Sequence, residues 1–183
     1  MKNVPAFVNT TSVLLMAATA VLTAAQLLYP NTFFLIAAIA VGTACYHTVS
    51  RGIIGPAVTR FQSRLNPAAF WFRPHRFEPK LYGLLRVKVW SKKLPTYTPD
   101  AFSLRTAAPE SILLSSCNAE LVHEVCMLTG FLPLVMAVFV GAFWVFFITS
   151  VVTAVADLLF VITLRYHRGR VIRILRKKEA KVL

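Results

Sequence analysis

The sequence predicts an all-α integral membrane protein with four transmembrane helices and an interfacial loop, rich in basic and aromatic residues, between helices 2 and 3. Hydrophobic residues make up 57% of the 183 residues, and the mean hydropathy is +0.64. They gather in four segments of about 20 residues, the length of helix that crosses the hydrocarbon core of a bilayer. All 20 Lys and Arg lie outside these segments. This combination excludes a soluble globular domain and indicates a multi-pass protein of the cell membrane.

Residues 1–50 are expected to form a transmembrane helical hairpin. The first apolar run, residues 7–29, leaves two interpretations open. The stretch 23–26 resembles the cleavage site of a signal peptide, but the run is long enough to span the bilayer, which favours an uncleaved first helix. The Tyr-Pro-Asn sequence at 29–31 predicts a turn, and residues 32–48 provide the second span.

Residues 51–111 are expected to form a cytoplasmic loop that rests on the membrane surface. Between positions 51 and 110 there are 11 Lys and Arg against three acidic residues. Within residues 70–77 aromatic rings alternate with cations, which is typical of a segment at the depth of the lipid headgroups. The loop is therefore not expected to span.

Glycines and prolines indicate where helices stop in this loop. Gly52 and the Gly55-Pro56 pair are expected to end the second helix. Residues 78–93 are the best candidate for a surface helix. The three prolines from position 95 to position 109 argue against its continuation.

Residues 112–165 are expected to form a second transmembrane hairpin, followed by a basic cytoplasmic tail over residues 166–183. The third span covers residues 112–137 and carries a Glu-x-x-His motif near its start. Pro133 should kink this helix. The fourth span covers residues 139–164.

Asp157 is an acidic residue inside the fourth span, about 10 Å from its basic end at a rise of 1.5 Å per residue. A carboxylate inside a membrane is costly, and it usually faces the interior of the bundle beside a partner. Asp157 is therefore a functional candidate, with a structural hydrogen bond as the alternative.

The placement of charge predicts the orientation of the chain. The loop carries 11 Lys and Arg and the chain after residue 164 carries eight, whereas neither hairpin turn carries any. Basic segments stay on the cytoplasmic side, so both termini and the loop are expected there. The net charge of +13 points to membrane lipids with anionic headgroups and to phosphate-bearing substrates rather than nucleic acid. Nothing in the pattern indicates an oligomeric state.

Glu120, His123 and Glu124 stand near the start of the third span at helical spacings of three and four, which place them on one face. A carboxylate beside an imidazole can orient the ring and fix its tautomer, so that the ring can take a proton from a hydroxyl. His123 is therefore a candidate general base, with Glu120 as the group that orients it. The alternative is a helix end whose polar residues meet water and headgroups.

Other chemical motifs are missing from the sequence. There is no glycine-rich nucleotide loop, zinc-ligand cluster or serine nucleophile elbow. One Glu-x-x-His falls short of the two copies in a di-iron bundle, so no metal is expected. Cys45, Cys117 and Cys126 lack the spacing of a metal site or a disulfide framework, and they are expected to pack in or beside the apolar segments.

Three short motifs occur together in the order of a known family. They are Val87-Lys88-Val89-Trp90-Ser91-Lys92-Lys93-Leu94-Pro95, Glu120-x-x-His123 and Arg165-Tyr166-His167-Arg168-Gly169-Arg170. Over roughly residues 70–176 the chain resembles the glycosyl-4,4'-diaponeurosporenoate acyltransferases. These small integral membrane proteins are assigned to the last step of staphyloxanthin-type carotenoid synthesis, in which a fatty acyl chain is joined to a sugar hydroxyl of a glycosylated carotenoid.

The chain departs from the pattern of this family at four positions of the fourth helix. Members typically have Asn at Asp157, Pro at Leu159, Gln at Leu164 and Asn at His167. These departures could mean a different acceptor, a different donor or a member whose chemistry has drifted.

The resemblance implies acyl transfer from a thioester donor such as acyl-CoA to a hydroxyl of an amphiphilic acceptor, with no bound cofactor. His123 would be the base and Glu120 would orient it. Cations would bind donor phosphates or stabilise the oxyanion, and two aromatic residues would anchor the site at the headgroup level. These implied substrate-binding residues are Lys88, Trp90, Lys92, Arg165, Tyr166 and Arg168. Positive-inside bias and an ordinary aromatic belt are the alternative explanations for them.

Two functions of other classes remain open. A non-catalytic membrane module would bind anionic lipid or a protein partner through the basic face. A small transporter would relay protons through Asp157, Glu120 and His123, although the sequence shows neither repeated nor discontinuous spans. The acceptor, the donor and the length of the acyl chain are not indicated.

Overall fold

The computed structural model describes residues 4–94, 99–103 and 105–180, and every regular element in these ranges is a helix. Four of the helices are long and apolar enough to cross a membrane, as the sequence predicted. The chain divides into two compact units. Pro95, which was expected to stop the surface helix, and the end of the basic tail, residues 181–183, lie outside the described residues.

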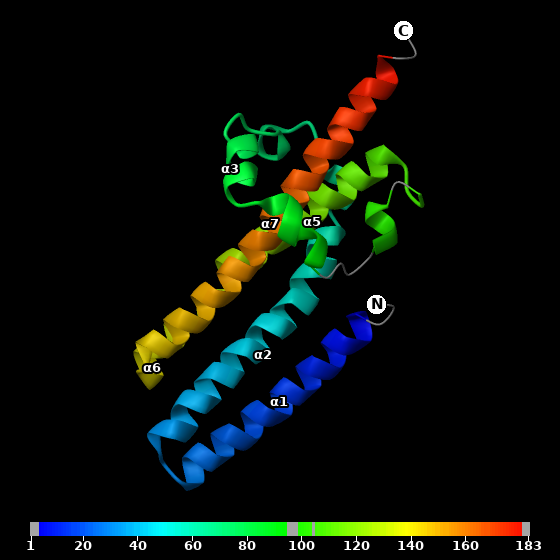
Figure 1. Ribbon diagram of the computed structural model, residues 1–183. Helices are drawn as coiled ribbons and strands as arrows, with labels where there is room; N and C mark the ends of the chain where they lie inside the picture. The colour runs from blue at the N-terminus through cyan, green and yellow to red at the C-terminus, as the bar shows by residue number, and fades with distance from the viewer. Residues whose placement is uncertain (1–3, 95–98, 104, 181–183) are drawn as a thin grey trace. The chain divides into compact units, whose positions relative to one another are not determined.

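The first unit is drawn from residues 1–54 and 125–157. Its helices α1 (Val4–Leu28) and α2 (Thr32–Thr59) run antiparallel side by side (Figure 1). They approach closely at Gly42, where an added Cβ would lie 3.4 Å from Cγ2 of Thr19. Helices α1 and α2 thus form a helical hairpin, and a small residue in α2 lets the two backbones come together.

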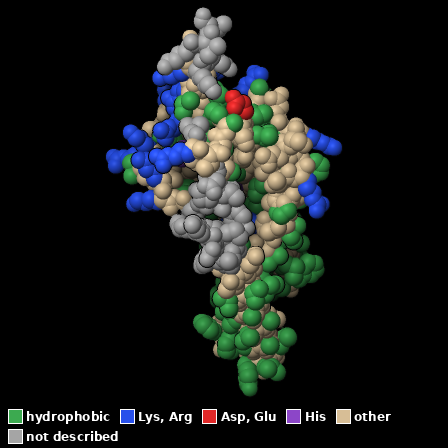
Figure 2. Space-filling model, turned by 90° about the vertical axis from the view of Figure 1, so that its right-hand side faces the viewer, with side chains coloured by type: hydrophobic (Ala, Val, Ile, Leu, Met, Phe, Trp, Pro, Cys, Tyr) green, Lys and Arg blue, Asp and Glu red, His purple; other side chains and the backbone are tan. Residues whose placement is uncertain are grey.

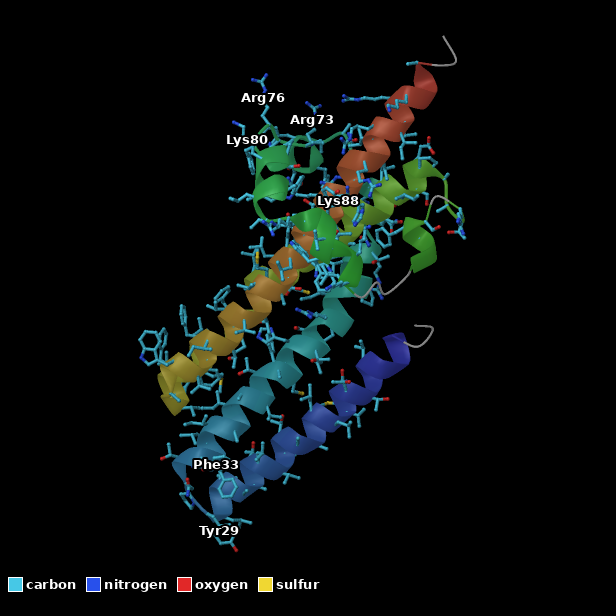
Figure 3. All side chains as sticks on the ribbon, in the orientation of Figure 1. Tyr29, Phe33, Arg73, Arg76, Lys80 and Lys88 are labelled. Atoms are coloured by element: carbon cyan, nitrogen blue, oxygen red, sulfur yellow. The ribbon has the colours of Figure 1, made fainter. Side chains whose placement is uncertain are left out.

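A short turn closes this hairpin between α1 and α2. The side chain of Asn31 accepts a hydrogen bond from the backbone N–H of Phe33 at 2.8 Å, which caps the start of α2. Tyr29 and Phe33 are about 70% exposed at this end (Figure 3). Exposed aromatic rings at the end of a span are typical of the membrane interface.

Helix α2 continues beyond the point at which the sequence predicted its end. Gly52 and Gly55-Pro56 were expected to stop it, but it runs to Thr59 with Pro56 inside. Pro56 occupies the last turn, where its missing N–H costs one hydrogen bond, and its own carbonyl still accepts from the N–H of Arg60 at 3.2 Å. The helix therefore ends later than the glycines and the proline predicted.

Polar side chains pair inside the first unit. Arg51 donates to a carboxylate oxygen of Asp157 at 2.8 Å, and the side chain of Asp157 is 2% exposed. His47 and Thr153 form a hydrogen bond of 3.1 Å between Nε2 and Oγ1. The carboxylate in the fourth span thus has the partner that its position demands.

The third span is interrupted more sharply than the predicted kink. Helix α5 (Pro109–Thr129) ends before Pro133, and two short helices follow, η5 (Leu132–Met136) and α6 (Ala137–Val140). Pro133 stands in the first turn of η5, where a missing N–H is tolerated. Gly141 and Ala142 then have φ of +76° and +54° and turn the chain into α7 (Phe143–Glu179).

The second unit is drawn from residues 55–124 and 158–183. Its short helices are η1 (Gln62–Arg64), η2 (Phe70–Phe72), α3 (Glu78–Leu84), α4 (Val87–Trp90), η3 (Ser91–Lys93) and η4 (Pro99–Phe102). The single surface helix predicted for residues 78–93 is divided into three pieces. Arg86 has φ of +49°, a left-handed conformation that no right-handed helix can contain, and it separates α3 from α4.

Helix α7 has 37 residues, so it is about 55 Å long at 1.5 Å per residue. The bilayer core is only about 30 Å thick. The basic segment after Leu164 is therefore a continuation of the same helix and not a separate tail. On the face drawn in Figure 2, lysine and arginine side chains gather in the second unit, whereas hydrophobic side chains predominate in the first.

Candidate functional site

Two arginines and two glutamates form a buried network in the second unit. Nε of Arg165 donates to Oε1 of Glu120 at 2.6 Å, and Nη1 of Arg165 donates to Oε1 of Glu78 at 2.7 Å. Arg168 donates through Nη1 to Oε2 of Glu120. Glu120 is fully buried, and Glu78 and Arg168 are 5% and 3% exposed. The side chain of Arg165 is 16% exposed, so the four charges neutralise one another largely, but not wholly, away from water.

The network links three helices and a loop of this unit. Glu78 begins α3, Glu120 lies in α5, and the two arginines are three residues apart on α7. Nη2 of Arg165 also donates to the backbone carbonyl of Trp71 at 2.5 Å. One guanidinium thus contacts α3, α5 and the loop before α3, which fixes these segments against α7.

Aromatic rings cover the network. The guanidinium of Arg168 lies over the ring of Phe72, with its Cζ 5.5 Å from the ring centroid. The hydroxyl of Tyr82 donates to Oε2 of Glu78 at 2.9 Å, and its ring meets that of Tyr166 edge-on. Burial, together with the hydrogen bond to the carboxylate of Glu78, raises the pKa of the Tyr82 phenol. Tyr82 therefore keeps its proton and remains a donor at physiological pH.

His123 lies one turn after Glu120 on α5, as the helical spacing predicted. Its ring stacks on that of Phe160, with centroids 4.7 Å apart and planes 2° apart. Glu124 accepts a hydrogen bond of 2.9 Å from Nε1 of Trp71. Each oxygen of Glu120 accepts from an arginine. Glu120 therefore anchors α7 to α5, and its expected effect on the ring of His123 stays a prediction.

A polar cavity of about 320 Å³ lies between α4–η3 and α7. Its lining residues are Lys88, Ser91, Lys92, Tyr166, His167, Arg170 and Arg173. Val87 holds the α4 side in place because its side chain is completely buried. Lys88, Ser91 and Lys92 then follow at spacings of three and four, which turn all three toward one side.

Helix α7 presents different faces to the network and to the cavity. At about 100° per residue, Tyr166, Arg170 and Arg173 fall within about 60° of one another. Arg168 lies on the opposite side of the helix, where it is buried. The cations of this basic segment therefore fall into two groups, those in the buried network and those that line the cavity, according to their position around the helix.

The structure distributes the expected substrate-binding residues among several places. Lys88, Lys92 and Tyr166 line the cavity. Arg165 and Arg168 belong to the buried network. Trp90 donates through Nε1 to the carbonyl of Leu85 at 2.8 Å, and Asp157 belongs to the first unit.

Sequence reasoning missed several members of the site. Ser91, His167, Arg170 and Arg173 line the cavity, and Glu78 completes the network. The spacing of Tyr166, Arg170 and Arg173 could have revealed a common face, had the segment been treated as helix. Glu78 gave no such signal, since its partners come from distant parts of the chain. Among the residues that the structure describes, no group of three His, Cys, Asp or Glu side chains could hold a metal ion.

Comparison with known proteins connects this site to a family. Searches of curated proteins and of solved structures gave no match. The family model for glycosyl-4,4'-diaponeurosporenoate acyltransferase matches residues 68–177, a range that contains both the buried network and the cavity. Because the match covers more than half of the chain and the three motifs fall within it, the chain belongs to the glycosyl-4,4'-diaponeurosporenoate acyltransferase family.

Proposed function

We propose that this protein is an acyltransferase of the cell membrane that moves a fatty acyl chain from a thioester donor to a hydroxyl of a lipid-like acceptor. A glycosylated carotenoid or a glycolipid would serve as the acceptor, and acyl-CoA would serve as the donor. The observation that carries the proposal is the family match over residues 68–177. It also argues against a non-catalytic module as the main function.

Acyl transfer needs a base at the attacking hydroxyl, and His123 is the residue proposed for this role. Its imidazole takes the hydroxyl proton while the oxygen attacks the thioester carbonyl. The tetrahedral intermediate then collapses, the carbon–sulfur bond breaks, and the imidazolium returns the proton to the leaving thiolate. The products are an ester and a free thiol. The stacking of His123 on Phe160 supports this role because it restricts the ring to one plane.

The buried network gives Glu120, Arg165 and Arg168 a positioning role in this proposal. Glu120 precedes His123 by one turn and is held by both arginines, so it fixes the turn of α5 that carries the histidine. A fixed base loses less entropy on reaching the transition state than a mobile one. Lys88, Trp90, Lys92 and Tyr166 remain proposed contacts to the substrates.

Substitution of His123 tests the proposal directly. His123→Ala should lower the rate of ester formation by about 100-fold to 10,000-fold, because a positioned base contributes on that order. Acylated product would be measured by mass spectrometry in membranes that contain equal amounts of protein. Glu124→Gln is the matched control: it is one residue away, and its amide oxygen can still accept from Trp71. A His123→Ala protein that acylates at the parental rate would refute the mechanism.

Comparison of Glu120→Gln with the double substitution separates the two residues. If Glu120 acts only by placing His123, the double variant should be no slower than His123→Ala alone. If the rate of the double variant instead falls by the product of the two single losses, Glu120 has a separate part in the reaction.

A further inference from the structure

The cavity between α4–η3 and α7 has the composition of an anion-binding site. Four of its seven lining residues are Lys or Arg, and no lining residue is acidic. The four cations converge from two helical segments onto a volume of about 320 Å³. Like charges brought together in this way repel one another, and a bound anion would remove the repulsion.

These cations differ from the two arginines of the buried network. Arg165 and Arg168 are neutralised by Glu78 and Glu120. No ion pair among the described side chains joins a carboxylate to Lys88, Lys92, Arg170 or Arg173. The neutralised pair thus supports the fold, whereas the cavity retains its positive charge.

Ser91 supplies a second, independent sign of a ligand. Ser91 is only 5% exposed, and it lines the cavity. Among the described residues its Oγ has no hydrogen-bond partner. Buried hydroxyls are nearly always hydrogen-bonded, because an unsatisfied one loses its solvation without compensation. A ligand oxygen in the cavity would accept a hydrogen bond from the Ser91 hydroxyl.

We propose that this cavity binds a phosphate group, with Arg170 and Arg173 as the principal ligands and Ser91 as a buried donor. Guanidinium forks match the oxygens of a phosphate, and the two lysines add point charges from the facing segment. The volume lies at the lower end of the range for ligand cavities, about 300–1,000 Å³. It suits one or two phosphate groups and leaves the apolar part of an amphiphile outside.

The phosphate site adds to the proposed function a binding place for the acyl donor. The identification of the ligand as the acyl donor rests on that proposed function. Carriers of acyl chains present phosphate in two forms: a water-soluble thioester carrier has it on its polar end, and a phospholipid has it in its headgroup. The cavity recognises the chemistry that the two share. Phosphate binding itself can be measured without any acylation.

Binding to the full-length protein in maltoside micelles, which contain no phosphate, tests the site. One arm titrates inorganic pyrophosphate by calorimetry, and the other adds phosphatidic acid to the micelles and detects bound lipid by native mass spectrometry. The cavity variants are Arg170→Gln with Arg173→Gln, and Ser91→Ala. The matched control is Arg76→Gln with Lys80→Gln, which removes the same charge from exposed side chains outside the cavity in the same unit (Figure 3).

We expect saturable binding that the double cavity variant weakens by about tenfold or more, that Ser91→Ala weakens by a few-fold, and that the control leaves nearly unchanged. This pattern with pyrophosphate identifies a water-soluble phosphate, and the same pattern with phosphatidic acid alone identifies a headgroup. No saturable binding in either arm, or an equal loss in both double variants, would overturn the site. His123→Ala should bind phosphate as tightly as the parental protein. A parental protein that binds phosphate but forms no ester would refute the acyltransferase and leave the phosphate site standing.

Discussion

Glu120 shows how much one buried side chain can hold in place. Its carboxylate is the common acceptor for Arg165 and Arg168, and none of it reaches solvent. Removing one partner of a buried ion pair leaves the others uncompensated, which commonly costs about 3–5 kcal/mol. Glu120 should therefore matter for stability independently of any catalytic effect.

We expect Glu120→Gln to lower the melting temperature of the purified protein by many degrees, because Arg168 would lose its carboxylate partner and Arg165 would retain Glu78. The change would be followed by intrinsic fluorescence during heating. Glu124→Gln, one turn along the same helix, should change the melting temperature little. Adding Arg168→Gln to Glu120→Gln should restore part of the loss, since it removes an unpaired buried charge. Equal melting temperatures for Glu120→Gln and the parent would contradict the network.

Tyr82 should make the second unit sensitive to alkali. Its pKa is raised above the ordinary value of about 10. The folded protein therefore holds this proton at a pH where the unfolded chain has lost it. The resulting stability is fully present below about pH 10 and is lost as the pH rises through the folded pKa. The ultraviolet absorbance of tyrosinate should show a late-titrating group that is missing in Tyr82→Phe. A normal titration of Tyr82 would contradict its buried contact with Glu78.

The sequence predicted which residues lie together only where the neighbours were local. The shared face of Glu120 and His123 follows from their spacing, and α5 contains both. The need of Asp157 for a partner follows from the cost of charge in a membrane, but the identity of that partner, Arg51, does not. The pairing of Glu120 with α7 joins positions more than 40 residues apart, which no spacing rule reaches.

The positions of helices were predicted best where a long apolar run determines them. The four spans lie where hydropathy placed them, because a run of about 20 apolar residues has few other solutions. Their ends were predicted less well: α2 passes through Pro56, and α7 extends far beyond Leu164. The division of residues 78–93 at Arg86 had no signal, since a positive φ is expected of glycine and not of arginine.

Gly130 provides a test of packing at the end of α5. An added Cβ would lie 3.0 Å from the carbonyl oxygen of Cys126 and 3.2 Å from Cε1 of His47. Gly130→Ala should therefore reduce the free energy of unfolding by about 1–3 kcal/mol, seen as a lower melting temperature, because the carbonyl of Cys126 and the ring of His47 must both shift. Gly52→Ala in α2 is the matched control, as an added Cβ there meets nothing within 4 Å. It should be neutral or stabilising, since Ala favours helix over Gly by about 1 kcal/mol. Identical effects of the two substitutions would show that the contact with His47 does not matter.

The whole chain makes a topological prediction. Its basic residues flank the spans on one side only, so we propose that both termini and residues 51–110 face the cytoplasm. In a Cys45→Ser background, a cysteine at exposed Arg76 should react with a membrane-impermeant maleimide only after the cells are permeabilised. A cysteine at exposed Asn31, in the hairpin turn, should react in intact cells. Labelling in the reverse order would overturn the orientation.

The ion pair between Arg51 and Asp157 constrains the order in which the protein can be built. The two residues lie 106 positions apart, so Arg51 is synthesised well before Asp157 during translation. During that interval α2 must keep its cationic end near the headgroups, and α7 later enters with a carboxylate that costs about 2.5–3.5 kcal/mol at the centre of a membrane. We therefore expect Arg51 of the first hairpin to act as a counter-ion that favours insertion of the last helix. We expect a chain that lost α2 to insert α7 less well, because the carboxylate of Asp157 would lose its ion pair with Arg51.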